Sequence, residues 1–220
     1  MIVQPVLIRI PFRPGLTGPQ RVERQRNFAR IALDHCARLS GAPAGPWPQT
    51  PARVPIPRDG FHWSITHKPR FAAAVIAREP VGIDIESLTP RTRDLSSAVA
   101  SPEEWALIGK VQSSKFKVQK QNQGPEGRTP TMSSPSWRTF FEVWTAKEAV
   151  LKANSLGIGA LNQCRIIGND TRGRMQLSFA GQSWNVQFLP YAGHLAALAC
   201  ADQLLQWHIM EPAASERPAL

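Results

Sequence analysis

Residues 81–86 of the chain read Val-Gly-Ile-Asp-Ile-Glu, a short apolar run that carries two carboxylates. The alternation predicts a β-strand, because successive side chains of a strand point to opposite faces. Asp84 and Glu86 then share one face with Gly82, about 6 to 7 Å apart along the backbone. An edge strand with a solvated acidic face would show the same pattern, so the meaning of this stretch depends on what accompanies it.

A second stretch, residues 144–152, reads Trp-Thr-Ala-Lys-Glu-Ala-Val-Leu-Lys. Read as a helix, it places Glu148 four residues from both Trp144 and Lys152, on one side of that helix. Lys147 adds a second ammonium group beside the carboxylate. Hard oxygen ligands next to ammonium groups suit a hard cation that holds a phosphate chain. The two stretches together therefore indicate a magnesium and pyrophosphate site.

The helix also has a plainer interpretation. Thr145 and Glu148, ahead of an apolar run, have the form of a capping box, in which the glutamate only satisfies a backbone amide. Residues 140–144 already read as helical, however, which would put Thr145 inside the helix rather than at its start. The functional interpretation then rests on the joint occurrence of several motifs.

Taken together, the two stretches resemble the signature of the 4′-phosphopantetheinyl transferases of the surfactin-synthetase-activating and enterobactin-synthase types. Residues 63–67, Trp-Ser-Ile-Thr-His, resemble the segment ending in histidine that this family has directly upstream. Arg24, Phe28 and Arg30 resemble its basic early helix. The resemblance runs from about residue 20 to about residue 200, with the motifs in the family's order and spacing.

The resemblance implies an α+β fold of two pseudo-symmetric lobes, each a small antiparallel sheet with helices, and an active site between them. Residues 1–80 would form a basic, coenzyme A-binding lobe and residues 81–220 a lobe with the metal site. The implied reaction transfers 4′-phosphopantetheine from coenzyme A to a serine of an acyl or peptidyl carrier protein, needs Mg²⁺ and releases adenosine 3′,5′-bisphosphate. Two complete lobes in one chain predict a monomer.

The resemblance also implies roles for single residues. Asp84, Glu86 and Glu148 are the expected metal ligands, and either Glu148 or a water molecule on the metal is the expected base. Lys152 is expected to act with Glu148 in catalysis, and both Lys147 and Lys152 to stabilise the phosphates. Six further side chains are expected to contact coenzyme A: Arg24, Arg26, Arg30, Arg53, Thr66 and His67.

The chain departs from the family's pattern at two places. A Gly-Lys-Pro-like segment is common in the family where residues 52–55 of this chain read Ala-Arg-Val-Pro, around Arg53. Small residues usually follow the histidine, whereas here Lys68 and Pro69 follow His67. These two residues change the turn expected above the pyrophosphate. Taken alone, His67 would read as an ordinary hydrogen-bonded histidine.

The formal net charge of +10 is unevenly distributed, because residues 1–70 hold eleven Arg and Lys against three acidic residues. Such an excess suits nucleic acid, an anionic membrane, or a polyanionic small molecule together with an acidic protein partner. Coenzyme A and an acidic carrier protein account for it without nucleic acid. A basic nucleic-acid-binding protein and a non-catalytic carrier-binding homologue are the alternatives from other functional classes.

Length and composition agree with an enzyme that is neither disordered nor embedded in a membrane. With 220 residues and 42% hydrophobic content, the chain can bury a core as one large domain or two small lobes. No apolar run approaches the roughly 20 residues of a membrane span, and residues 1–10 lack the pattern of a cleaved leader. We therefore expect a cytoplasmic protein. Its three widely spaced cysteines are expected to be buried thiols.

Hydrophobic periodicity and turn signals predict two halves of similar make-up. The first is expected to contain a strand at 2–10, a helix at 20–39, a proline-rich link at 42–57 and a three-stranded meander at 61–66, 71–77 and 81–86. The second is expected to contain helices at 101–109 and 138–154 and strands at 163–167, 174–179, 184–189 and 195–201, with a hairpin turn at 180–183. Residues 110–136, with five Lys and Arg against one Glu, are expected to form a flexible basic loop that either docks the carrier protein or is a tolerated insertion.

Overall fold

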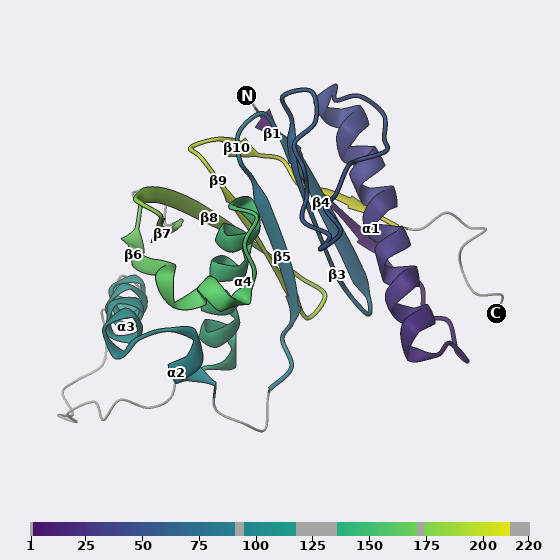
Figure 1. Ribbon diagram of the computed structural model, residues 1–220. Coiled ribbons are helices and arrows are strands. Elements are labelled where there is room, and N and C mark those ends of the chain that lie inside the picture. The colour runs from purple at the N-terminus through teal and green to yellow at the C-terminus, as the bar shows by residue number, and fades with distance from the viewer. Residues whose placement is uncertain (1, 91–94, 118–135, 171–173, 212–220) are drawn as a thin grey trace.

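The computed structural model of the chain describes residues 2–90, 95–117, 136–170 and 174–211. Two sheets lie face to face in the middle of the molecule, and a long helix covers the outer face of each (Figure 1). The predicted α+β class is confirmed. The lobes meet along one apolar layer, to which Phe71, Val75 and Leu198 contribute.

The first sheet has the strand order β11-β2-β4-β3, made of His208–Met210, Val6–Arg9, Phe71–Ala77 and His62–Lys68. Strands β2 and β3 are antiparallel to β4, whereas β11 is parallel to β2. Helix α1, Gly18–Ser40, packs on the outer face of this sheet. A capping box between Thr17 and Gln20 starts α1, and Gly41, in the left-handed conformation at φ 66°, ends it.

The second sheet is antiparallel throughout and has the order β5-β9-β8-β7-β6, made of Gly82–Ser87, His194–Cys200, Gln182–Tyr191, Met175–Phe179 and Arg165–Asn169. Its helical elements are α2 (Ser96–Val99), α3 (Pro102–Lys117), α4 (Trp137–Ala153) and the 3₁₀ helix η1 (Ile158–Gln163). The predicted hairpin is confirmed, because Phe179 pairs with Gln182 around Ala180 and Gly181.

The alternation of residues in strand β5 directs its apolar and its acidic side chains to opposite faces. Ile83 and Ile85 enter the apolar layer between the sheets, so Gly82, Asp84 and Glu86 face the opposite way, toward α4. Gly82 is needed for the close approach of that helix, because a Cβ atom there would lie 1.9 Å from the carbonyl oxygen of Ala149. Helix and strand therefore touch backbone to backbone beside the acidic face.

The predicted meander is wrong. Strands β3 and β4 do pair, but β5 leaves their sheet and pairs with β9 of the second sheet. The predicted strand 2–10 is also divided, because Pro5, which has no amide hydrogen for a ladder, separates β2 from the short strand β1 (Ile2–Val3). Strand β1 pairs in parallel with β10, Leu204–Leu205.

The expected flexible loop at 110–136 needs correction at its start, because α3 continues to Lys117. Residues 118–135 of that prediction lie outside the described part of the chain. The expected division at residue 80 stays a prediction, although β11 joins the first sheet rather than the second. All three cysteines are buried free thiols, as predicted. Among the described helices, none combines the length and apolar character needed to cross a membrane.

Candidate active site

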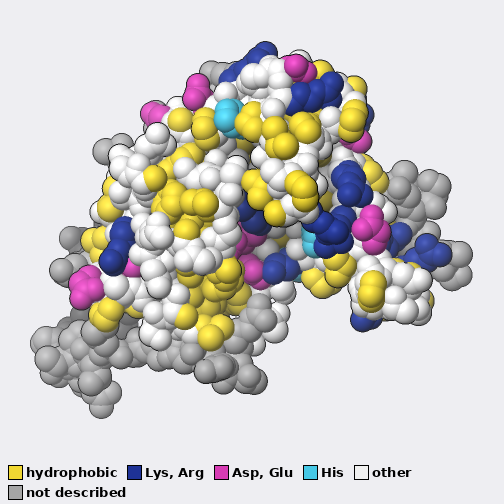
Figure 2. Space-filling model, viewed as in Figure 1, with side chains coloured by type: hydrophobic (Ala, Val, Ile, Leu, Met, Phe, Trp, Pro, Cys, Tyr) yellow, Lys and Arg dark blue, Asp and Glu magenta, His cyan; other side chains and the backbone are white. Residues whose placement is uncertain are grey.

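A cavity of about 1180 Å³ lies between the lobes. Its walls come from α1 and β3 of the first lobe and from β5 and α4 of the second. It is centred where two edge strands meet, because β3 and β5 end their respective sheets there and the Ile83 amide donates a hydrogen bond of 3.2 Å to Ser64 Oγ. Lys and Arg side chains gather around this hollow together with acidic side chains and a histidine (Figure 2).

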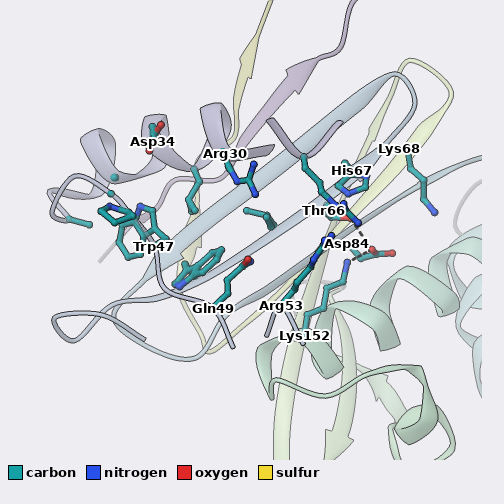
Figure 3. Close-up of a pocket in the computed structure, with 18 of the residues that line it drawn as sticks. Arg30, Asp34, Trp47, Gln49, Arg53, Thr66, His67, Lys68, Asp84 and Lys152 are labelled. Carbon is teal, nitrogen blue, oxygen red and sulfur yellow. Dashed lines mark hydrogen bonds and ion pairs between the residues drawn. The ribbon is translucent and has the colours of Figure 1, made fainter. Parts of the chain in front are cut away.

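Asp84 lies at the base of the cavity and is only 5% exposed. Its Oδ1 accepts hydrogen bonds from Thr66 Oγ1 at 3.1 Å and from Lys152 Nζ at 2.6 Å, one from each lobe (Figure 3). Its Oδ2 is buried and accepts no hydrogen bond from any described residue. A buried carboxylate oxygen without a donor is costly unless a ligand or cation satisfies it.

Glu86 lies two residues further along β5 and is 6% exposed. Its Oε1 accepts a hydrogen bond of 3.1 Å from Trp144 Nε1 and lies 2.8 Å from Lys68 Nζ. The indole comes from α4 and the ammonium from the end of β3, so this carboxylate also contacts both lobes. Two of the three expected ligand positions are thus held on one strand by donors from opposite walls.

Glu148, the third expected ligand, lines the cavity from α4. Burial and the nearby negative charge of Asp84 raise the pKa of its carboxyl, with a further contribution from Glu86, while Lys152 acts in the opposite direction. Three carboxylates therefore share one region of the cavity.

His67 and Thr66 both line the cavity from β3, and their expected contact with the phosphates of coenzyme A stays a prediction. His67 Nδ1 lies 2.9 Å from Gln25 Oε1, which orients the ring. Burial lowers the pKa of His67, and the positive charges of Arg26, Lys152 and Lys68 lower it further. The free protein thus keeps a neutral imidazole inside a cationic wall, where an arriving anion would favour the protonated ring.

Of the four arginines expected to contact coenzyme A, three line the cavity and one does not. Arg26 and Arg30, one helical turn apart on α1, line the cavity, and Arg53 lines it from the proline-rich link (Figure 3). Arg24 does not line it. Its guanidinium lies 5.0 Å from the ring centroid of Phe28 instead, because a shift of two residues turns a side chain to another side of a helix.

Lys147 is likewise placed away from the phosphates that it was expected to contact. Its side chain is 1% exposed, and Nζ lies 2.8 Å from Glu104 Oε1 inside the second lobe. Adjacent residues of a helix point about 100° apart, so α4 directs Glu148 to the cavity and Lys147 to the interior. The expected role of Lys147 at the phosphates is therefore wrong for the described structure.

The lining residues that were not anticipated from the sequence include Lys68, Arg38 and Trp47. Arg38 had a usable signal, because it follows Arg26 and Arg30 on α1 at multiples of four residues. Lys68 was noticed only as a departure from a motif. Trp47 had no local signal, since the proline-rich link has no periodicity and the indole is placed by its contact with Trp63, 6.1 Å between ring centroids.

The residues fit a divalent cation in two respects. Asp84 offers a buried oxygen without a donor among the described residues, and burial together with the charge of Asp84 raises the pKa of the Glu148 carboxyl. Both are hard oxygen ligands of the kind that Mg²⁺ takes. Within the described residues, however, no three His, Cys, Asp or Glu side chains already converge as a preformed metal centre, so the three-ligand set stays a prediction.

Fold and cavity together define an α+β protein with a cavity between its two sheets that is lined by both acidic and basic side chains. The family model of the 4′-phosphopantetheinyl transferase superfamily matches residues 80–201, more than half of the chain. The chain belongs to this superfamily. A 4′-phosphopantetheinyl transferase from Bacillus subtilis is 26% identical over 98 residues, which are 44% of this chain and 35% of that relative. The chain thus matches about a third of the relative's length.

Proposed function

We propose that the protein transfers the 4′-phosphopantetheine group of coenzyme A to a serine hydroxyl of an apo carrier protein. The observation that carries this proposal is the composition of one cavity, which places Asp84, Glu148 and Lys152 of one lobe opposite Thr66 and His67 of the other. A pyrophosphate needs cationic and hydrogen-bonding groups on several sides, and a cavity between two lobes offers them.

The cationic wall of the first lobe would bind the phosphates of coenzyme A. Arg26 and Arg30 line the cavity from α1, and His67 lines it from β3. Arginine forks suit phosphate oxygens because they donate two parallel hydrogen bonds. Lys152 Nζ, held 2.6 Å from Asp84 Oδ1, would lie next to the pyrophosphate and stabilise the charge that develops on it.

Asp84 and Glu148 would hold Mg²⁺, with Glu86 as the third ligand expected from the resemblance. When bound, the cation would neutralise the pyrophosphate and the charge that develops on the departing phosphate oxygen. Thr66 and Lys152 orient Asp84 through its Oδ1, which keeps Oδ2 directed away from these donors.

The reaction requires that the serine oxygen bond to the phosphorus that carries pantetheine. The phosphoanhydride bond of that phosphorus then breaks, and adenosine 3′,5′-bisphosphate leaves with the bonding electrons. The serine proton would pass to Glu148, one of the two bases that the resemblance implies.

Mass spectrometry of a panel of apo carrier proteins, incubated with coenzyme A, Mg²⁺ and the protein, tests the proposal. We expect at least one carrier to gain the mass of phosphopantetheine, with equimolar release of adenosine 3′,5′-bisphosphate. Asp84→Asn and Glu148→Gln should remove the product while leaving the circular dichroism spectrum unchanged. Wild-type turnover by the Asp84 variant would contradict the assignment.

The same experiment separates the alternative functions. A non-catalytic homologue would bind a carrier without changing its mass. A nucleic-acid-binding protein would leave every carrier unmodified and bind generic duplex with a steep dependence on salt and no need for Mg²⁺. The pathway to which the carrier belongs is not part of the proposal.

A further inference from the structure

Gln25 and His67 form a polar contact between helix α1 and strand β3. The distance from His67 Nδ1 to Gln25 Oε1 is 2.9 Å, and both side chains are half-buried. His67 lines the cavity between the lobes, whereas Gln25 does not. The glutamine therefore contacts one nitrogen of the imidazole from outside the cavity.

Apolar packing on both elements leads up to this contact. On β3, His67 shares a face with Trp63 and Ile65, which pack against residues of α1. On α1, Gln25 lies three residues before Phe28, which is buried against the same sheet. The polar pair thus continues the apolar contact between helix and strand, and that packing fixes where the two side chains meet.

The Gln25 oxygen decides which nitrogen of a neutral His67 ring carries the proton. An amide oxygen can only accept a hydrogen bond, so at this distance it favours the ring with its proton on Nδ1. A neutral histidine without such a partner prefers to carry the proton on Nε2 in water. The contact therefore leaves Nε2 with a lone pair, as the ring nitrogen available to a ligand in the cavity.

The charges around the ring favour the same arrangement. Both signs of charge line the cavity, and they come from each element around His67: Glu23, Arg26 and Arg30 of α1, Lys68 of β3, Asp84 and Glu86 of β5, and Glu148 and Lys152 of α4. After burial, the charges that lower the pKa of His67 are those of Arg26, Lys152 and Lys68. A lone pair is more favourable than an N–H dipole toward these cations.

We propose, on the basis of the function proposed above, that Gln25 is a positioning residue that holds the His67 proton on Nδ1 and so presents Nε2 to a phosphate oxygen of coenzyme A. When the phosphate binds, Nε2 takes up a proton from the solvent and forms a charge-assisted hydrogen bond to that oxygen. The Nδ1–H group keeps its bond to Gln25, so the ring need not turn. Because Gln25 is neutral, the positive charge forms only when the anion is present.

NMR of the full chain, with heavy nitrogen in its histidines, tests the proposal, because the shifts of Nδ1 and Nε2 show which of them carries a proton. The chain has five histidines, so His67→Gln would assign the signals. Spectra near neutral pH, with and without coenzyme A, would compare wild type with Gln25→Leu and Gln25→Glu. Asn27→Leu is the matched control, since the Asn27 side chain contacts Arg30 on the same helix. Thermal melts confirm that each variant is folded.

In the free wild-type protein we expect the His67 proton on Nδ1, and coenzyme A should protonate Nε2. Gln25→Leu should shift the proton of the free ring to Nε2 and weaken coenzyme A binding by about fivefold, the effect of one lost hydrogen bond. Gln25→Glu should protonate both nitrogens before coenzyme A is added, so that its affinity changes less with pH than in wild type. Asn27→Leu should give the wild-type signals of His67.

A proton on Nε2 of His67 in the free wild-type protein would overturn the proposal, and so would wild-type His67 signals in Gln25→Leu. Signals of His67 that stay unchanged when coenzyme A binds would overturn the phosphate contact of Nε2 and the proposal with it. If calorimetry shows that wild type does not bind coenzyme A, the proposed function fails together with that contact. The spectra of the free protein still decide whether Gln25 sets the position of the proton, so the two failures are distinguishable.

Discussion

Lys147 Nζ lies 2.8 Å from Glu104 Oε1, and both side chains are almost completely buried. The same Glu104 oxygen accepts a hydrogen bond from the Ile166 amide, while Oε2 accepts one from the Ser101 amide at the start of α3. Burial disfavours the ionised Glu104, but the hydrogen bonds from Lys147, Ile166 and Ser101 together outweigh it and lower the pKa of its carboxyl. One ion pair thus connects α3, α4 and β6 behind the active-site face of α4.

Removing the lysine should therefore affect stability rather than phosphate binding. We expect Lys147→Met to lower the free energy of unfolding by about 3 to 5 kcal/mol near neutral pH, because it leaves Glu104 as a buried, unpaired charge. Chemical denaturation would measure it. Arg138→Met is a matched control on the same helix, where the exposed pair with Glu142 should contribute about 0.5 kcal/mol.

The pH dependence of the stability lost in Lys147→Met tests whether the unpaired charge of Glu104 causes that loss. A lowered carboxyl pKa stabilises the fold above the unfolded value, and this contribution is lost as the pH falls through the folded value. In Lys147→Met the pKa of Glu104 should rise instead, so the deficit relative to wild type should shrink between about pH 7 and pH 5. A deficit that is constant over this range would show that lost packing, not charge, is responsible.

Gly82→Ala should disturb the site without touching a charge. The new methyl group would meet the Ala149 carbonyl oxygen at 1.9 Å and the Ala153 amide nitrogen at 2.5 Å, so α4 must move away from β5. We expect a loss of about 1 to 3 kcal/mol in stability and a weaker response of the melting temperature to Mg²⁺. Gly157→Ala, where a methyl group meets no described atom, should resemble wild type in both measurements.

The arginines of α1 give a third prediction. Arg30→Ala should weaken coenzyme A binding by about tenfold, because a charge-assisted hydrogen bond to phosphate is lost, whereas Arg24→Ala should leave it nearly unchanged. Isothermal calorimetry with coenzyme A and with 3′-dephospho-coenzyme A would measure both and show which phosphate Arg30 contacts. Equal losses in the two variants would contradict the separation of their side chains.

His67 should take up a proton when coenzyme A binds. Its pKa is lowered in the free protein by burial and then by Arg26, Lys152 and Lys68, so the ring is neutral near pH 7. A bound phosphate anion raises that pKa, and coenzyme A affinity should therefore increase as the pH falls toward 6. Calorimetry in two buffers of different ionisation enthalpy would count the protons, and His67→Gln should remove the difference between buffers.

Local patterns in the sequence predicted the parts of the site that lie on single elements. The alternation in β5 placed Asp84 and Glu86 on one face, and the spacing in α4 placed Trp144, Glu148 and Lys152 on one side of the helix. The structure brings all five to one cavity. Such patterns suffice because strand and helix geometry fix which neighbouring side chains share a direction.

Partners that are distant in the sequence had no such pattern. Strand β5 looked like the third strand of a meander, and only its pairing with β9 more than a hundred residues later places it in the other sheet. Lys147 was expected at the phosphates from the resemblance. Its actual partner, Glu104, lies on a different helix, α3, and no local pattern indicates that the two side chains meet. The form Ser101-x-x-Glu104 is visible in the sequence as a capping box, but it does not reveal which lysine the glutamate meets.

Strand β11 follows the second lobe in the sequence but belongs to the first sheet, so that sheet is completed late in synthesis. It supplies residues His208–Met210 as the outer strand of the first sheet, parallel to β2. During synthesis from the N-terminus, that sheet therefore has an open edge along β2 until nearly the whole second lobe has emerged from the ribosome. An unpaired edge is a template for mispairing with other chains. The first lobe thus depends for protection, while it folds, on a strand that follows the whole second lobe in the sequence.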